Sequence, residues 1–261
     1  MSSVTVRGLT DTHAHLCSPE FAADLPTVLE RARQHGIERV VSVSENLADF
    51  ERNLALAEAH PGRILVAGGL FPTDLDTTAA EALIDRLRQE RSRLSAIGEV
   101  GLDHWKVKEE EERALQRQIF EHFIALSVEL DLPLNVHSRS AGRQTIACLL
   151  EQGARKVQLH AFDGRAAKAL PAIEAGYFFS VPPSVVRSKQ KQKLVRRLPL
   201  DNLLLETDSP VLGPDREQRN EPANAVVSLQ AIAELQEVPV EKVASAVRRN
   251  TERLYGIPAA G

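Results

Sequence analysis

The sequence predicts an α/β protein whose single domain is a (β/α)8 TIM barrel. Short apolar runs alternate with longer amphipathic stretches along the whole chain, as expected when each strand is followed by a helix. Eight such apolar runs are present, the number that closes a barrel of this type. The length of 261 residues is filled by one barrel without remainder.

The expected strands are short and apolar, and Gly and Pro separate them. In chain order they span Gly8–Thr12, Arg39–Ser42, Ile64–Leu70, Ala96–Gly98, Leu134–Val136, Val157–Leu159, Phe178–Val181 and Leu203–Glu206. The residues that break the pattern between them include Pro61, Gly62, Pro133, Gly176 and Pro199, and such residues commonly end strands and helices.

Helical periodicity fills the stretches between these strands. Clear examples are Phe21–His35, Thr145–Gln152 and Pro239–Leu254, the last of which is expected to close the barrel. Gly36 follows the first of them, as is typical of a helix end. Thr78 and Glu81 have the spacing of a capping box, which predicts that a helix begins there.

A doubly wound parallel sheet is the alternative fold for alternating strands and helices. It would usually have a Gly-rich phosphate-binding turn after the first strand. Here the first strand runs into Asp11-Thr12-His13-Ala14-His15, which is not such a turn. No linker of domain scale, internal repeat or low-complexity segment interrupts the chain, so residues 1–261 are expected to form one domain.

Composition limits the classes of partner and location. The formal net charge of −4 excludes a broad electrostatic grip on duplex DNA, but it leaves room for binding a few nucleotides at a strand end. Cys17 and Cys148 are the two cysteines, which suits a reducing, cytoplasmic location. No apolar run reaches membrane-spanning length. We therefore expect no membrane partner and no obligate protein partner.

Metal-binding side chains gather where the expected strands end. These residues are His13, His15, Glu99, His137, His160 and Asp208. In a barrel the carboxyl ends of all strands meet on one face, where active sites are built. One such histidine alone is more often a buried, hydrogen-bonded residue, but the repetition over five strands favours a site for one or two divalent ions, with Zn, Mn and Mg all compatible. Glu206 is expected to support a ligand or accept a buried hydrogen bond.

Several motifs resemble those of TatD-type deoxyribonucleases. They are DTHAH, GEVGLD, NVHSR, HAFDG, ETDSP, RNEPAN and NTERLYG. The stretches NVHSRSAGR and GYFFSVPPS are most similar to the third TatD-domain paralogue of animals. The resemblance covers nearly the whole chain and implies a barrel of the metal-dependent hydrolase type. It also implies two divalent metal ions (Zn, Mg or Mn), the six ligands above with Glu99 as the bridge, and 3′→5′ exonuclease activity on single-stranded DNA, with RNA as a further substrate.

One position departs from the family pattern. The resemblance implies a histidine before the proline that follows the third strand, and this chain has Phe71 before Pro72. Phe71 cannot ligate a metal or donate a hydrogen bond to phosphate. It is expected either to stack on a base, which is worth about 1–3 kcal/mol in single-strand binders, or to fill apolar space at the rim.

Asp208 is expected to be the catalytic base as well as a ligand, because a carboxylate beside a metal can deprotonate the attacking water. A pure ligand role is the alternative.

Ser138 and Arg139 are expected to contact substrate phosphates, since an Arg fork matches phosphate oxygens. A salt bridge is the alternative for Arg139. Arg219 and Asn220, in the long loop after the last strand, are expected to contact substrate as well.

Three further features have both a structural and a functional interpretation. Asp103 is expected to orient a ligand or to cap the following helix. Trp105, the single tryptophan, is expected to stack on a base or to pack between helices. The basic run from Arg187 to Arg197 is expected to be the solvated face of a helix rather than a nucleic-acid contact.

Two other functions remain open at this point. The same ligands could serve cleavage of another bond, such as an aminoacyl ester on tRNA or an amide, because barrels host many chemistries. The chain could also be a non-catalytic, metal-stabilised adaptor. The presence of all six ligand residues weighs against the adaptor.

Overall fold

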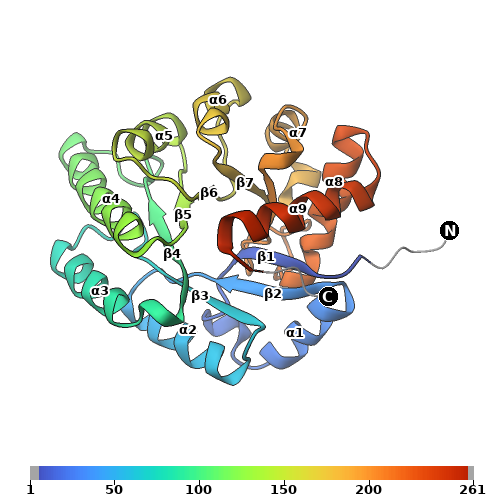
Figure 1. The fold of residues 1–261 in the computed structure, drawn as a ribbon, viewed down its shortest axis with the longest axis horizontal. Coiled ribbons are helices and arrows are strands. Elements are labelled where there is room, and N and C mark those ends of the chain that lie inside the picture. Colours follow the sequence, from blue (N-terminus) through green and yellow to red (C-terminus); the bar gives the residue numbers. More distant parts are fainter. Residues whose placement is uncertain (1–5, 258–261) are drawn as a thin grey trace.

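The computed structural model describes residues 6–257 and contains eight parallel strands that follow one another around a barrel (Figure 1). The strands are β1 (Leu9–Ala14), β2 (Ile37–Ser42), β3 (Ile64–Gly68), β4 (Leu94–Gly101), β5 (Leu134–His137), β6 (Val157–Leu159), β7 (Phe178–Val181) and β8 (Leu203–Leu205). Each pairs in parallel with the next. A parallel bridge between Ala14 and Ser209 joins the last strand region to the first. The barrel prediction is confirmed.

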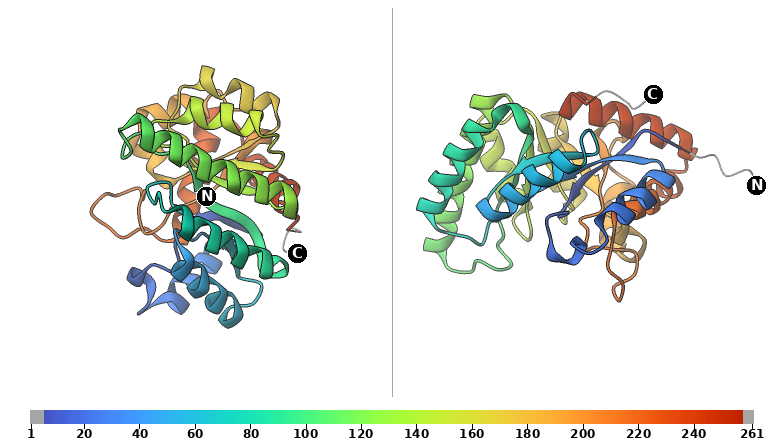
Figure 2. Two further views of the ribbon diagram at one scale, coloured as in Figure 1. Left: turned by 90° about the vertical axis from the view of Figure 1, so that its left-hand side faces the viewer. Right: turned by 90° about the horizontal axis from the view of Figure 1, so that it is seen from below.

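Helices surround the strands, with the termini of the described chain on the outside (Figure 1). They are α1 (Leu25–Gln34), α2 (Leu47–Ala59), α3 (Thr77–Gln89), α4 (Glu110–Leu130), α5 (Gly142–Glu151), α6 (Ala166–Glu174), α7 (Lys189–Val195), α8 (Ala225–Gln236) and α9 (Val240–Tyr255). The loop between β8 and α8 projects away from the barrel (Figure 2, orange). Within the described residues, no helix combines the length and the apolar character that crossing a membrane requires.

The buried apolar side chains form three clusters, one of which joins Phe178, Leu204 and Leu254. A large cluster of buried apolar side chains fills the space between strands and helices, and a small one formed by Val41, Val43, Ala67 and Ala96 lies apart from it, with Tyr255 packed against it. The Tyr255 hydroxyl donates to Gln158 Oε1 (2.5 Å). The last helix therefore anchors its end among the strands, in agreement with its predicted closing role.

Several predicted boundaries were wrong, among them the three that follow. The first helix begins at Leu25 rather than Phe21, because Pro26 fits only the first turn of a helix. Asp76, not Thr78, caps α3: its carboxylate accepts hydrogen bonds from Thr78 N and Ala79 N. Strand β4 continues to Gly101, so Glu99 lies within the strand rather than at its end.

Candidate metal centre

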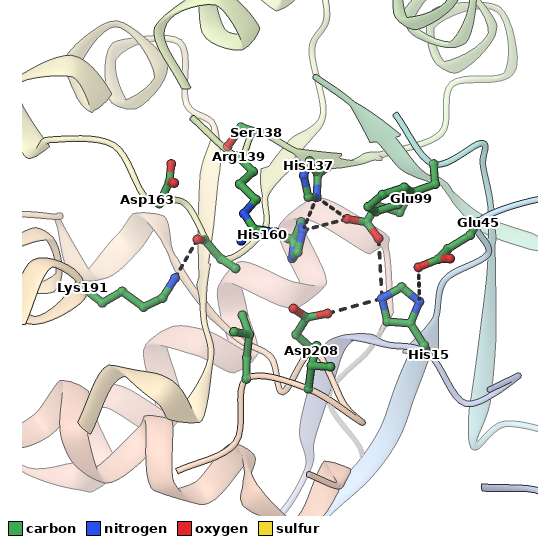
Figure 3. A pocket seen from close by; sticks show the side chains of 14 residues that line it. His15, Glu45, Glu99, His137, Ser138, Arg139, His160, Asp163, Lys191 and Asp208 are labelled. Atoms are coloured by element: carbon green, nitrogen blue, oxygen red, sulfur yellow. Dashed lines mark hydrogen bonds and ion pairs between the residues drawn. The ribbon is translucent and has the colours of Figure 1, made fainter. Parts of the chain in front are cut away.

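The strand ends deliver the predicted ligands to one pocket. It has a volume of about 440 Å³ and is lined by five of the six: His15, Glu99, His137, His160 and Asp208 (Figure 3). His13, the sixth, is completely buried. Its ring stacks on that of His160, with ring centroids 3.9 Å apart and planes inclined by 5°. The structure thus brings together residues from β1, β4 and β5 and from the segments after β6 and β8.

One half of this cluster, which we call the first half-site, consists of His13, His15, Asp208 and one oxygen of Glu99. The two His Nε2 atoms lie 3.3 Å apart. Asp208 Oδ1 is 3.4 Å from His13 Nε2 and 3.3 Å from His15 Nε2. Glu99 Oε2 is 3.7 and 3.5 Å from the same nitrogens. Both carboxylate oxygens therefore lie within 3.7 Å of the two imidazole nitrogens.

The second half-site consists of His137, His160 and the other oxygen of Glu99. Glu99 Oε1 is 2.7 Å from His137 Nδ1 and 2.8 Å from His160 Nε2. The two imidazole nitrogens are 3.4 Å apart. Glu99 thus contributes one carboxylate oxygen to each half-site.

These distances fit divalent ions. Ligand atoms at 2.0–2.2 Å from an ion and about 90–110° from one another are separated by about 3.0–3.5 Å. The separations within both half-sites, from 2.7 to 3.7 Å, bracket that range. Imidazole nitrogens and carboxylate oxygens are the donors that Zn and similar ions accept. The residues present therefore fit the metal ions that the sequence predicted.

Two of the histidines are held by polar side chains behind them. His13 Nδ1 lies 2.7 Å from Asn135 Oδ1. His137 Nε2 lies 3.1 Å from Asp103 Oδ2, while Asp103 Oδ1 accepts hydrogen bonds from Trp105 N and Lys106 N, both 2.8 Å. Such contacts fix the orientation of a ligating ring. Asp103 therefore orients a histidine, as one of its two predicted roles required, and it holds the turn after β4. It does not cap the following helix, because the N-cap of α4 is Glu109.

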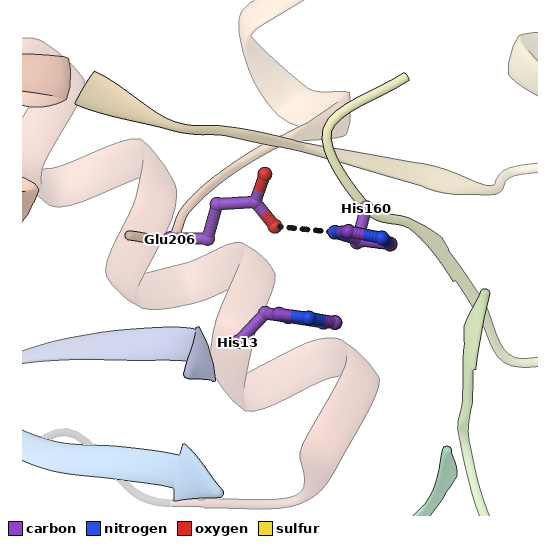
Figure 4. A group of neighbouring side chains, drawn as sticks. All are labelled: His13, His160 and Glu206. Atoms are coloured by element: carbon purple, nitrogen blue, oxygen red, sulfur yellow. Dashed lines mark ion pairs between the residues drawn. The ribbon is translucent and has the colours of Figure 1, made fainter. Parts of the chain in front are cut away.

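Glu206 lies behind His160 (Figure 4). It is fully buried and accepts hydrogen bonds from Ala161 N (2.8 Å) and Ser180 Oγ (2.5 Å). Its Oε2 is 3.7 Å from His160 Nδ1, a nitrogen that has no hydrogen-bond partner among the described residues. The predicted supporting role of Glu206 agrees with this placement.

The carboxylates and imidazoles of the cluster alter one another's pKa. Burial opposes ionisation of Glu99, but the charge of His160 and hydrogen bonds with His137 and His160 hold its pKa well below the usual range. Burial likewise opposes ionisation of Asp208, whose pKa is nevertheless lowered by hydrogen bonds with His13 and His15. Without an ion, the carboxylates are charged and attract positive charge.

The histidines shift the opposite way. Burial disfavours the charged imidazole of His15, yet its hydrogen bond with Asp208 and the charges of Glu99 and Glu45 raise its pKa to about 9. Burial also disfavours charged His137 and His160, and neighbouring carboxylates raise both pKa values. A proton thus occupies the His15 ring of the metal-free cluster at neutral pH, and protonation of His137 and His160 is favoured. A cation would replace these protons.

Three predicted substrate contacts lie at the pocket. Phe71, Ser138 and Arg139 line it. Phe71 contacts the ring of His137 edge-on, with centroids 5.1 Å apart. The Arg139 guanidinium lies 3.8 Å from the centre of the Trp105 ring and forms no ion pair with a described residue, so the alternative salt bridge is absent there. Trp105 is 47% exposed rather than packed between helices.

Arg219 and Asn220 do not line this pocket, and their predicted substrate roles lack support. Arg219 forms a two-pronged ion pair with Asp24 (2.9 and 2.6 Å) and lies over the Phe21 ring. Asn220 is buried and donates hydrogen bonds to the carbonyls of Thr207 (2.8 Å) and Val211 (2.7 Å). Both residues instead fix the loop after β8, on which Asp208 lies.

The sequence interpretation missed three charged residues of the pocket, Lys191, Glu45 and Asp163. Lys191 belongs to the basic run that was assigned to a solvated face, but its side chain points inward and Nζ donates to Ala161 O at 2.7 Å (Figure 3). Burial lowers its pKa. Glu45 lies after β2, with Oε1 3.6 Å from His15 Nδ1. Its place after a strand was the one available signal, since active-site residues gather there.

Comparison with known proteins identifies the family. A model of TatD related DNases matches residues 10–256. The chain belongs to this family. A human protein named Deoxyribonuclease TATDN3 is 43% identical over 259 residues, covering 95% of this chain and 94% of that protein. A Bacillus subtilis protein, the "uncharacterized metal-dependent hydrolase YabD", is 34% identical over 257 residues, covering 95% of this chain and 99% of that protein.

Solved structures agree with this assignment. The crystal structure of YjjV, a TatD homologue from Escherichia coli, superimposes with a TM-score of 0.89 at 28% identity, covering 97% of this chain and 100% of that one. The resemblance drawn from the sequence motifs is therefore confirmed. The chain is a metal-dependent hydrolase of the TatD deoxyribonuclease type.

Proposed function

We propose that this TatD-family chain is a 3′→5′ exonuclease on single-stranded DNA, with RNA as a second substrate, and that it uses two divalent ions. His13, His15 and Asp208 would hold one ion and His137 and His160 the other, with Glu99 as the bridge. The observation that carries this proposal is the placement of Glu99, whose two oxygens lie in different half-sites. A bridging carboxylate is expected where two ions act together on one phosphodiester.

When bound, the ions would supply a lowered water pKa and compensation of charge on the phosphate. The role left to Asp208 is to accept the proton of the attacking water, because its lowered pKa keeps it ionised at neutral pH. Its position is fixed by the backbone: Asp208 N donates to His13 O at 2.8 Å. Glu99 orients the two half-sites relative to each other.

Other residues of the pocket would hold the strand end. Arg139 and Lys191 place cations beside the half-sites, and Ser138 adds a hydroxyl, so that phosphate oxygens have partners. Phe71 offers an aromatic surface for a base, a contact worth about 1–3 kcal/mol. A pocket of about 440 Å³ suits a small ligand such as a terminal nucleotide.

A single domain and a cytoplasmic location are also part of the proposal. The free, buried state of both cysteines supports the location.

The test uses metal-stripped protein and a 5′-labelled single-stranded DNA, with RNA and duplex controls and with Mg, Mn or Zn restored separately. We expect a metal-dependent ladder that shortens from the 3′ end. Asp208→Asn should retain the fold and most of the metal but lose about 10²–10⁴-fold in turnover. Near wild-type turnover of this variant would refute the base assignment. Intact substrate under every condition, despite bound metal, would instead favour ester or amide hydrolysis or the adaptor.

A further inference from the structure

A basic groove lies between α6 and α7, next to the metal pocket. We propose that this groove binds the sugar-phosphate backbone of the strand on the 5′ side of the cleaved bond. The inference rests on the proposed exonuclease function, which places the 3′ end at the half-sites. It gives a function to the residues of the basic run Arg187–Arg197 that do not line the metal pocket.

The groove has a volume of about 790 Å³. Arg165, at the start of α6, and Lys193, Arg196 and Arg197, on and after α7, supply its four cations. All four are exposed. Among the described residues that line the groove, none is acidic. The surface is therefore wide, accessible and of a single charge.

The groove adjoins the metal pocket. Asp163 lines the metal pocket, and its chain neighbour Gly164 lines the groove. In the same way Lys191 lines the pocket while Gln190, just before it, lines the groove. The loop after β6 and the first turn of α7 thus line both the metal pocket and the groove. A nucleic-acid strand that leaves the half-sites past Lys191 would therefore enter the groove.

Among the described residues the four cations have no carboxylate partner, whereas several other arginines of this chain do. Arg86, Arg88 and Arg93, for example, each form ion pairs with two acidic residues. Within residues 6–257, no ion pair or side-chain hydrogen bond satisfies Arg165, Lys193, Arg196 or Arg197. In a chain of net charge −4, four unpaired cations along one groove are a local excess. Their charge is complementary to a row of phosphates.

The chemistry predicts binding without base selectivity. Flexible cations at the groove surface neutralise phosphates and do not read base edges. Each phosphate neutralised on a single strand adds about 0.7 to the slope of log affinity against log salt. Loss of three cations should therefore reduce the slope by about 2. Only a strand long enough to leave the metal pocket should show this change.

The experiment measures binding of fluorescein-labelled oligo-dT of three and twelve nucleotides by anisotropy, from 50 to 300 mM KCl. It uses the metal-loaded Asp208→Asn chain, which is expected to bind the strand but to cut it far more slowly. Against it we compare the same chain with Lys193→Ala, Arg196→Ala and Arg197→Ala combined. The matched control is Arg155→Ala, an exposed and unpaired arginine just before β6, at the opposite end of the barrel.

We expect the triple variant to bind the 12-mer at least about tenfold more weakly at low salt, with the reduced slope, and to bind the trimer as before. Hydrolysis of bis(p-nitrophenyl) phosphate by the triple variant with Asp208 intact should be unchanged. An equal loss for trimer and 12-mer, no loss for either, or the same loss with Arg155→Ala would overturn the proposal. Because anisotropy reports binding alone, failure of the nuclease assay leaves this result interpretable.

Discussion

The two half-sites differ in how the fold holds them. In the first, backbone hydrogen bonds at the closure of the barrel fix the ligand-bearing segments: Asp208 N donates to His13 O, and His15 N donates to Ser209 O, both 2.8 Å. In the second, His137 depends on a side chain, Asp103, which belongs to the loop after β4. A polar side chain supports one ring in each half-site, since His13 contacts Asn135 and His137 contacts Asp103. The first half-site depends in addition on closure of the barrel, whereas the second depends on a correctly formed loop.

Their surroundings differ as well. Both half-sites open onto the pocket, the first through His15 and Asp208 and the second through His137 and His160. Phe71 packs on the second half-site, which also lies next to Arg139. Substrate groups that enter the pocket thus meet the second half-site together with the residues that would bind phosphate or base. We infer that the first half-site mainly secures metal and water, and the second adapts to the substrate.

Replacing Glu99, which the two half-sites share, should weaken metal binding in both of them. Glu99→Gln keeps the shape of the side chain but removes the negative charge from both. Because several kcal/mol of electrostatic stabilisation depend on the ions, we expect turnover to fall by about 10³-fold or more. Metal analysis after dialysis should show reduced occupancy of both half-sites. Loss of one metal equivalent with the other fully retained would argue against the bridge.

Weakening the loop support should affect the second half-site alone. Asp103→Asn preserves the oxygen that accepts hydrogen bonds from Trp105 N and Lys106 N but weakens the contact with His137. Loss of such a supporting contact typically costs about 10–100-fold in metal affinity. Isothermal titration should show one weakened and one unchanged binding step.

The control for this variant is Asp215→Asn. Asp215 Oδ1 likewise accepts a hydrogen bond from a residue two positions later, Glu217 N (2.9 Å), but it is exposed and orients no histidine. It should leave both binding steps unchanged. If Asp103→Asn weakened both steps equally, the two half-sites would not be separately supported.

Metal binding should release protons. A ligating histidine must be neutral, but the pKa of His15 is raised to about 9, and the pKa values of His137 and His160 are raised as well. At pH 7 the His15 ring is protonated in the metal-free protein, and protonation of His137 and His160 is favoured. Each displaced proton changes the apparent metal affinity by about tenfold per pH unit. Affinity should therefore rise with pH up to about 9 for the step that involves His15.

Calorimetry at pH 7 in buffers of different ionisation enthalpy measures the protons released. A slope of zero protons per ion would contradict the raised pKa values of these histidines.

The sequence was sufficient for the barrel and for the six residues of the cluster, because strand ends in a barrel share one face whatever the loops do. The sequence did not predict the orientation of side chains whose direction depends on tertiary packing. Lys191 lies in a run of charges, and only the placement of α7 turns it toward Ala161. Arg219 finds its partner Asp24 at a separation of 195 residues, a contact that no local pattern encodes. Phe71 could be located but not assigned a role.

Phe71 therefore supports the smallest and most informative change. Phe71→His places a hydrogen-bond donor beside His137, within the pocket. A hydrogen bond to a phosphate oxygen is worth about 0.5–1.5 kcal/mol, so kcat should rise by about 2–10-fold, with metal content unchanged. Phe71→Leu, which keeps the apolar character but cannot stack, is the matched control. If Phe71→His and Phe71→Leu both raised KM and neither raised kcat, the ring of Phe71 would instead be a surface on which a base stacks. Phe71 itself would then provide the substrate contact beside the second half-site.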